Sequence, residues 1–112
     1  MPPVSGATIT GPLQGTVLAE QTFPTPRPIR LTVMISATYN FFALLEIWDE
    51  QGRVVYDVVL PVTAPIWTSP EMGPLNMAAN GRVRVVSRNT PEVTPGPLEV
   101  QATILARDWG ER

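Results

Sequence analysis

The chain has 112 residues, the size of one ordinary domain and too few for two well-cored ones. It contains no Cys, no His and no Lys, since all eight of its basic residues are Arg. These absences exclude a disulfide scaffold, a thiolate zinc site, a thiol nucleophile and histidine-based acid–base catalysis. The net charge of −2 argues against a nucleic-acid-binding protein, because no excess of positive charge exists to neutralise phosphates.

Hydrophobic residues make up 44% of the chain and charged residues only 16%, which is typical of a globular protein. The low charge favours a surface that is partly covered by other subunits. The first six residues have neither the basic region nor the apolar region of a signal peptide. The longest apolar stretch, residues 41–47, is interrupted by Glu46 and is too short to span a membrane. We therefore expect no membrane association and, for a cellular protein, a cytoplasmic location.

The first 28 residues are rich in proline and glycine, and Pro24, Pro26 and Pro28 predict an extended, polyproline-like segment. Two interpretations remain open for this region. It is either an edge strand with a stiff connector or an arm that adds a strand to the sheet of a neighbouring subunit. The predicted organisation is a single domain, with residues 1–28 as a proline-rich arm with edge strands and residues 29–112 as a β-sandwich core.

Apolar and polar residues alternate through most of the chain that follows. The pattern is clearest over residues 29–37, 83–85 and 98–106, where β-branched residues are frequent. A period of two is typical of half-buried strands, and the scattered prolines are incompatible with long helices. The apolar members of residues 29–37 and 98–106 are therefore the predicted core.

Two turn signals divide the alternating segments. Residues 49–52 end in Gly52 and predict a hairpin between residues 41–49 and 53–60, and Asn80-Gly81 predicts another between 74–79 and 82–89. The expected strands are near residues 7–10, 13–20, 28–38, 41–49, 53–60, 74–79, 82–89 and 97–107. This pattern predicts an all-β fold, an antiparallel β-sandwich or jelly roll of seven to eight strands.

Few residues offer catalytic chemistry. The serines have no histidine or lysine to activate them, and the acidic residues lack the spacing of a calcium loop. Glu46 and Asp57, on neighbouring predicted strands, leave open a glycosidase-type carboxylate pair, but the favoured interpretation is a solvated hairpin in which both pair with arginines across the sheet. We expect no enzyme activity, no cofactor and no metal.

Exposed aromatic and apolar residues are the better candidates for function. Trp48, Tyr56 and Trp67 would stack against sugars in a carbohydrate-binding module, although Trp48 and Tyr56 would also fit at the rim of the core. Ile66, Trp67 and Met72 lie in a proline-bounded loop that either folds back on the core or meets another chain. Trp109 has the same two alternatives.

Arg82, Arg84 and Arg88 form a basic stripe on one predicted strand. Arginines so placed bind carboxylates or phosphates through two parallel hydrogen bonds. The simpler interpretation is a solvated face that is balanced by the acidic strands.

The proline-rich arm, the low charge, the absence of cysteine and the pattern over residues 74–85 resemble the small capsid, decoration and tail-accessory proteins of bacterial viruses. This resemblance covers most of the chain and identifies no single functional residue. It implies a virion structural protein that acts by self-assembly or by binding a virion surface.

Two classes of function follow from these observations. The first is a non-enzymatic structural subunit that forms a homo-oligomer or binds other structural proteins. Its candidate interface residues are Pro24, Pro26, Pro28, Ile66, Trp67, Met72 and Trp109. The alternative is a carbohydrate-binding β-sandwich module that uses its exposed aromatic residues.

Overall fold

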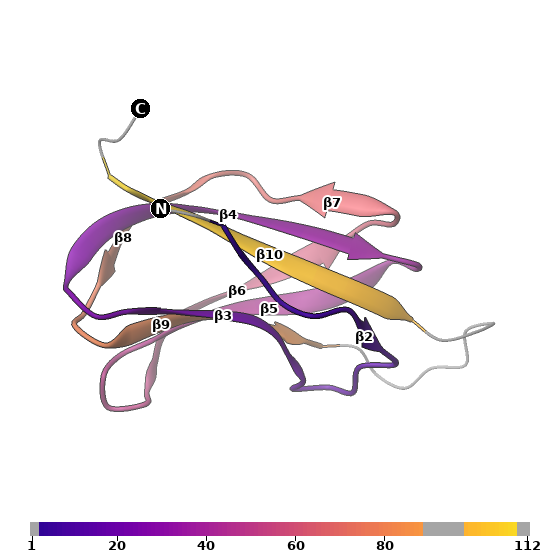
Figure 1. The fold of residues 1–112 in the computed structure, drawn as a ribbon, viewed down its shortest axis with the longest axis horizontal. Helices are drawn as coiled ribbons and strands as arrows, with labels where there is room; N and C mark the ends of the chain where they lie inside the picture. The colour runs from indigo at the N-terminus through magenta and orange to yellow at the C-terminus, as the bar shows by residue number, and fades with distance from the viewer. Residues whose placement is uncertain (1–2, 89–97, 110–112) are drawn as a thin grey trace.

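The computed structural model describes residues 3–88 and 98–109, and these fold into ten antiparallel strands (Figure 1). The first five strands are β1 (Val4–Ser5), β2 (Ile9–Thr10), β3 (Val17–Phe23), β4 (Arg27–Ala37) and β5 (Phe41–Trp48). The other five are β6 (Val54–Val62), β7 (Ile66–Thr68), β8 (Met72–Met77), β9 (Gly81–Ser87) and β10 (Glu99–Asp108). The predicted all-β class is confirmed. In the described part of the chain, no helix has the length and apolar character needed to cross a membrane.

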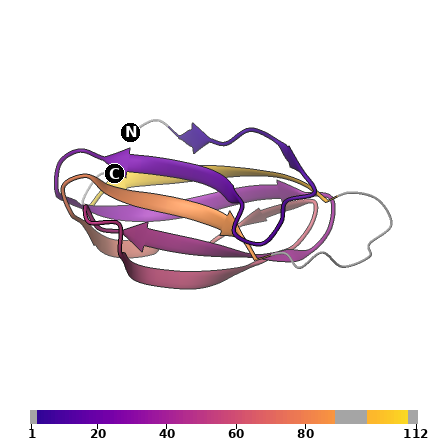
Figure 2. The same cartoon turned by 90° about the horizontal axis from the view of Figure 1, so that it is seen from below.

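The strands form two sheets that lie face to face (Figure 2). Sheet A has the order β1-β10-β4-β7, with β2 also paired to β10 and β8 also paired to β4. Sheet B has the order β3-β9-β5-β6. Each sheet therefore combines strands that are far apart in the sequence.

The core lies between the sheets and follows the alternation of the sequence. On β4 and β10 every second side chain is buried, and the two sets lie side by side in register on the inner face of sheet A, as in the pairs Ile35 with Ala102 and Val33 with Ile104. The inner side chains of β5 and β9 cover them from sheet B. The predicted core over residues 29–37 and 98–106 is confirmed.

The strand count differs from the expectation because short pieces were missed. The predicted loop over residues 61–74 contains β7, whose three residues pair with β4. Short β1 precedes the first expected strand, and the strand expected over residues 13–20 runs instead over 17–23, so ten strands replace seven or eight. Strands of two or three residues are too short to show an alternating pattern. The connection expected over residues 89–97 lies outside the described residues.

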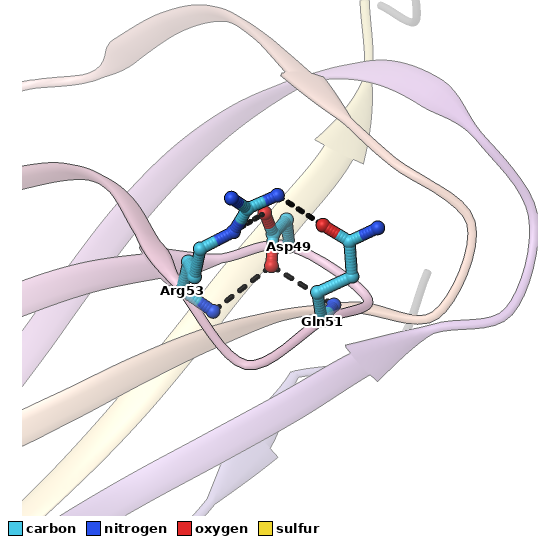
Figure 3. A network of polar contacts seen from close by, with 3 residues as sticks. All are labelled: Asp49, Gln51 and Arg53. Carbon is cyan, nitrogen blue, oxygen red and sulfur yellow. Dashed lines mark hydrogen bonds and ion pairs between the residues drawn. The ribbon is translucent and has the colours of Figure 1, made fainter.

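The turn between β5 and β6 has the predicted hairpin geometry (Figure 3). One oxygen of Asp49, Oδ1, accepts the main-chain N–H groups of Gln51 and Arg53, each at 2.9 Å, and Gly52 has a φ of 78°. The Arg53 side chain binds Gln51 and lies 3.3 Å from Asp49 Oδ2. The Arg53 main-chain hydrogen bond is the largest of the causes that lower the pKa of Asp49 below its usual 3.8.

The Asn80-Gly81 turn exists, but the hairpin predicted around it is wrong. Asn80 has the left-handed φ of 60° that the dipeptide favours, and Gly81 N–H donates to the Ala78 carbonyl. However, β8 pairs with β4 in sheet A, whereas β9 pairs with β3 and β5 in sheet B. The Asn-Gly signal reports the backbone conformation of a turn and not which strands pair beyond it. Here the turn carries the chain from one sheet to the other.

The N-terminal segment lies beside β3 and closes one side of the molecule (Figure 2). Gly6 N–H donates to the Ala102 carbonyl of β10 at 2.9 Å. The α-carbon of Gly6 faces β3 so closely that an added Cβ would overlap the Leu18 carbonyl oxygen. Glycine is therefore the residue that allows this segment, an edge of sheet A, to lie so close to β3 of sheet B.

Candidate functional site

The outer face of sheet B brings together charged and aromatic residues from β3, β5 and β9. Trp48 of β5 lies opposite Arg82 of β9, and the neighbouring Glu46 lies opposite Arg84. Glu20 of β3 lies opposite Arg84 on its other side. We call these five residues the Trp48 cluster. They face away from the core because their neighbours in each strand, such as Ile47 and Val83, are buried.

Trp48 lies at the centre of this cluster and is held in place by its neighbours. Its indole Nε1 donates to Glu46 Oε1 at 3.3 Å. The guanidinium carbon of Arg84 is 4.8 Å from the ring centroid, and that of Arg82 is 5.6 Å away. Both distances are within the range of cation–π attraction. The half-buried indole is therefore fixed to β9 on the outer surface of the sheet.

Arg84 links Trp48 to β3, an edge strand of sheet B. Its Nε donates to Glu20 Oε2 at 2.7 Å, and the two side chains are 22% and 33% exposed. A charge-assisted hydrogen bond of this length holds the guanidinium in one orientation. The Trp48 cluster thus runs as one chain of contacts from β3 through β9 to β5.

A shallow depression of about 330 Å³ lies beside this cluster. Its lining combines the Trp48 ring with polar and apolar side chains: Gln14, Gly15, Leu44, Glu46, Trp48, Arg84, Val86, Ser87 and Arg88. An aromatic ring beside a carboxylate and guanidinium groups offers stacking and hydrogen bonding, which are the requirements of binding. Within residues 3–88 and 98–109, no group of three or more acidic residues is placed to hold a metal ion.

At the other end of the outer face of sheet B, large apolar side chains are open to solvent. Phe42 of β5 is 59% exposed, and Val59 of β6 is 41% exposed. Leu44 and Val86 lie between them and the Trp48 cluster. Exposed apolar side chains gathered on one face mark surfaces that bind other molecules. This end of the sheet therefore offers a different kind of contact from the charged end.

The structure does not bring the three predicted stacking residues together. Trp48 faces outward from sheet B, whereas Tyr56 lies opposite Ile47 and so faces the other side of that sheet. Trp67 is in sheet A, opposite Ile35, and packs against the core. A single flat platform of Trp48, Tyr56 and Trp67 is therefore absent, and Trp48 alone lines the depression.

Two of the predicted interface residues meet at one end of sheet A. Trp109 N–H donates to the Pro28 carbonyl at 2.9 Å, which extends the pairing of β10 with β4. Trp109 is 51% exposed, and Pro28 is exposed beside it. Pro24 and Pro26 are exposed in the connection that leads from β3 to β4.

The remaining predicted interface residues divide between the surface and the core. Ile66 is 64% exposed and lies opposite Ser36 on β4. Trp67 and Met72 are half-buried and pack against the core from β7 and β8. Of the three, only Ile66 is open to a partner.

Two features of this surface were not predicted from the sequence. The first is that Arg82 and Arg84 lie over the Trp48 ring and do not form a simple solvated stripe. The second is that Phe42 and Val59 are exposed on the outer face. The alternation over residues 41–48 contains the signal for Phe42, because it places Phe42 and Trp48 on the same face. The order of the strands, which sets Arg84 beside Trp48, has no such signal.

Comparison with known families and proteins adds no assignment. No family model matches this sequence, and no curated protein matches it. The function is therefore argued from the residues and their geometry.

Proposed function

We propose that this protein is a non-enzymatic structural subunit that assembles with copies of itself or with other structural proteins. The observation that carries the proposal is the exposure of large apolar side chains in the β5–β6 hairpin. Among the described residues, this hairpin contains five large hydrophobic residues that are at least 41% exposed: Phe42, Val54, Val55, Tyr56 and Val59. Leaving such a group in water is unfavourable, so burial against another subunit would stabilise an assembly.

The strand pairing supports a jelly-roll fold for this subunit. If β1 and β2 are counted as one interrupted strand, and β7 and β8 as another, ten strands reduce to eight. The first of these eight then pairs with the last, the second with the seventh, the third with the sixth and the fourth with the fifth. This is the pairing of one long hairpin that has been rolled up, which is the construction of a jelly roll.

Jelly rolls form both viral capsid and lectin domains, so the fold alone does not decide between the two classes of function. The exposed apolar hairpin favours the structural class, in which a virion capsid or decoration protein is the specific proposal. In that case the location is the virion. For a cellular protein we propose the cytoplasm.

Light scattering behind a sizing column, at two protein concentrations, tests the proposal. We expect a discrete multiple of the 12.2 kDa chain mass, in a proportion that rises with concentration. A monomer at both concentrations would contradict self-assembly.

Carbohydrate binding is the second candidate, favoured by the placement of Trp48 in an open depression beside Glu46 and Arg84. Glycan titration followed by tryptophan fluorescence tests it. A binding site at Trp48 predicts a response that Trp48→Ala removes, while Trp67→Phe, a change in sheet A, leaves the response in place. Absence of any response from a broad glycan panel would exclude this candidate.

A further inference from the structure

The free edge of β6 presents main-chain groups that no described strand satisfies. Arg88 N–H donates to the Phe42 carbonyl, so the main-chain groups of Phe42 point toward β9. In an antiparallel ladder these directions alternate, and Leu44 and Glu46 therefore also point toward β9. Their partners on β6 are Val59 and Asp57, whose N–H and C=O groups must then point to the free edge.

This edge is the longest uninterrupted one in the described part of the chain. β6 has nine residues, whereas the outer strands of sheet A are broken into β1 and β2 on one side and β7 and β8 on the other. The opposite edge of sheet B, β3, is approached by the N-terminal segment at Gly6. Natural proteins commonly shorten, cover or charge their edge strands, and a long open edge pairs readily with another strand.

The exposed side chains of β6 are mainly apolar. Val55 is 62% exposed, and Val54, Tyr56 and Val59 are each 41% exposed. Asp57 is the only charged residue in β6. The β6 edge is therefore suited to pairing with an extended and mainly apolar strand.

We infer that β6 pairs antiparallel with β6 of a second copy of this chain, about a two-fold axis at Val59. This inference rests on the proposed self-assembly and specifies which strands form the contact between the copies. An edge strand related to its partner by a two-fold axis offers identical donors and acceptors, so it complements itself. Each Val59 exchanges both main-chain hydrogen bonds with its counterpart, and each Asp57 N–H donates to a Pro61 carbonyl.

The charge of Asp57 and the position of Pro61 select this register. A two-fold axis at Asp57 would oppose two carboxylates directly, and an axis at Val58 would set them on adjacent diagonal positions, both of which are unfavourable. With the axis at Val59 the two carboxylates are four positions apart, roughly 14 Å along the strand. Pro61, which has no N–H group, then lies at the end of the ladder, where proline is tolerated.

The same register brings together the exposed apolar residues at the centre of the ladder, whereas Val54, Val55 and Tyr56 lie beyond it. The two Val59 side chains lie side by side on the outer face of sheet B, and Phe42 of each copy lies next to Pro61 on the same face. The result is one eight-stranded sheet, four strands from each copy, with a continuous apolar strip across the junction.

The first test measures native mass for Val59→Lys beside a matched control, Val17→Lys. Val17 is 40% exposed on β3, against 41% for Val59, so the same substitution is made at the same exposure on the opposite edge. We expect Val59→Lys to weaken association at least tenfold, because two ammonium groups would face each other. Val17→Lys should leave the mass unchanged.

The second test uses the absence of cysteine from the chain. A Val59→Cys protein should be linked to a dimer by a short bifunctional thiol reagent, because paired Cα atoms in this register are about 5.5 Å apart. Val17→Cys and Val55→Cys are the controls and should remain unlinked, since the two copies of residue 55 would be on the order of 25 Å apart. The cross-linking result tests the β6 contact even if the Val59→Lys protein fails to fold.

The outcomes separate this inference from the proposed function. An oligomer that Val59→Lys leaves intact, and that Val59→Cys does not link, would overturn the β6 contact while self-assembly stands. A wild-type protein that is monomeric at every concentration, together with a Val59→Cys protein that stays unlinked, would overturn both. Loss of association on Val17→Lys instead would place the contact on β3.

Discussion

The two edge strands of sheet B, β3 and β6, differ in how far the rest of the chain covers them. At the β3 edge the N-terminal segment lies against Leu18, and Phe23 is only 1% exposed. At the β6 edge no described strand is paired, and Tyr56 is 41% exposed. Because the chain covers β3 and leaves β6 open, we infer that the two edges have different roles. The covered edge contributes to the stability of the monomer, and the open edge is available for association.

The largest expected effect compares one aromatic residue from each edge. Phe23→Ala removes a fully buried ring and should lower the free energy of unfolding by about 3–5 kcal/mol. Tyr56→Ala removes a ring that is already partly in water, so its cost should be less than about 1 kcal/mol. Urea denaturation of the monomer at low protein concentration measures both. Equal losses at the two positions would contradict the difference between the edges.

Gly6→Ala tests how the β3 edge is covered. The new Cβ would overlap the Leu18 carbonyl, so the N-terminal segment must move and the free energy of unfolding should fall by about 1–3 kcal/mol. Hydrogen exchange should also quicken at the amide of Gly6, whose bond to the Ala102 carbonyl would be strained. Gly11→Ala is the control at a position with room for a side chain, because an added Cβ has no neighbour within 4 Å there. Its φ of 62° makes the substitution somewhat unfavourable for a separate reason, the left-handed backbone conformation. Unchanged stability of Gly6→Ala would mean that the segment is not needed at this edge.

A smaller effect is expected at Arg84, which connects the β3 edge to β5 through the Trp48 cluster. Arg84→Gln removes the ion pair with Glu20 and the closer of the two guanidinium groups over Trp48, at a cost of about 1 kcal/mol. Arg82→Gln is the matched control, because it removes only the more distant guanidinium at 5.6 Å and should cost less. Denaturation followed by tryptophan fluorescence measures both changes. If Arg82 proved the costlier loss, the chain of contacts through Glu20 would carry little of the energy.

The smallest effect concerns pH and the turn that leads into the open edge. The pKa of Asp49 is lowered in the folded protein, so the ionised carboxylate stabilises the turn. This contribution is fully present above the usual pKa of 3.8 and is lost as the pH falls through the lower folded value. Asp49→Asn should therefore flatten the decrease in stability below about pH 4. Thermal denaturation of both proteins between pH 2 and 6 measures this, and parallel curves would contradict it.

The local structure of this protein was predictable, and the neighbours of its strands were not. Alternation identifies the buried side chains of β4 and β10, because a pleated strand turns successive residues to opposite faces. The turn at Asp49–Gly52 was equally clear, since its two strands pair with each other directly. At Asn80-Gly81 the same kind of signal failed, because the chain crosses there between sheets and the pairing depends on distant residues.

The candidate site shows the same division. The outward direction of Trp48 follows from alternation, and the structure places it on the outer face. The contact of Trp48 with Arg84 depends on β9 lying beside β5, more than thirty residues later in the chain. The exposure of Val59 depends on β6 being an edge, which is a property of the whole sheet. Neither can be read from a local pattern.

The position of β10 has a consequence for the nascent chain on the ribosome. All four strands of sheet B lie between residues 17 and 87, so they leave the exit tunnel before β10, which spans residues 99–108. Until β10 emerges, β4 can pair with β7 and β8 on one side only, and β1 and β2 lack the strand with which they pair. The strands of sheet B are therefore synthesised before sheet A has its β10 strand, and a chain truncated before residue 99 would lack the pairing of β10 with β1, β2 and β4.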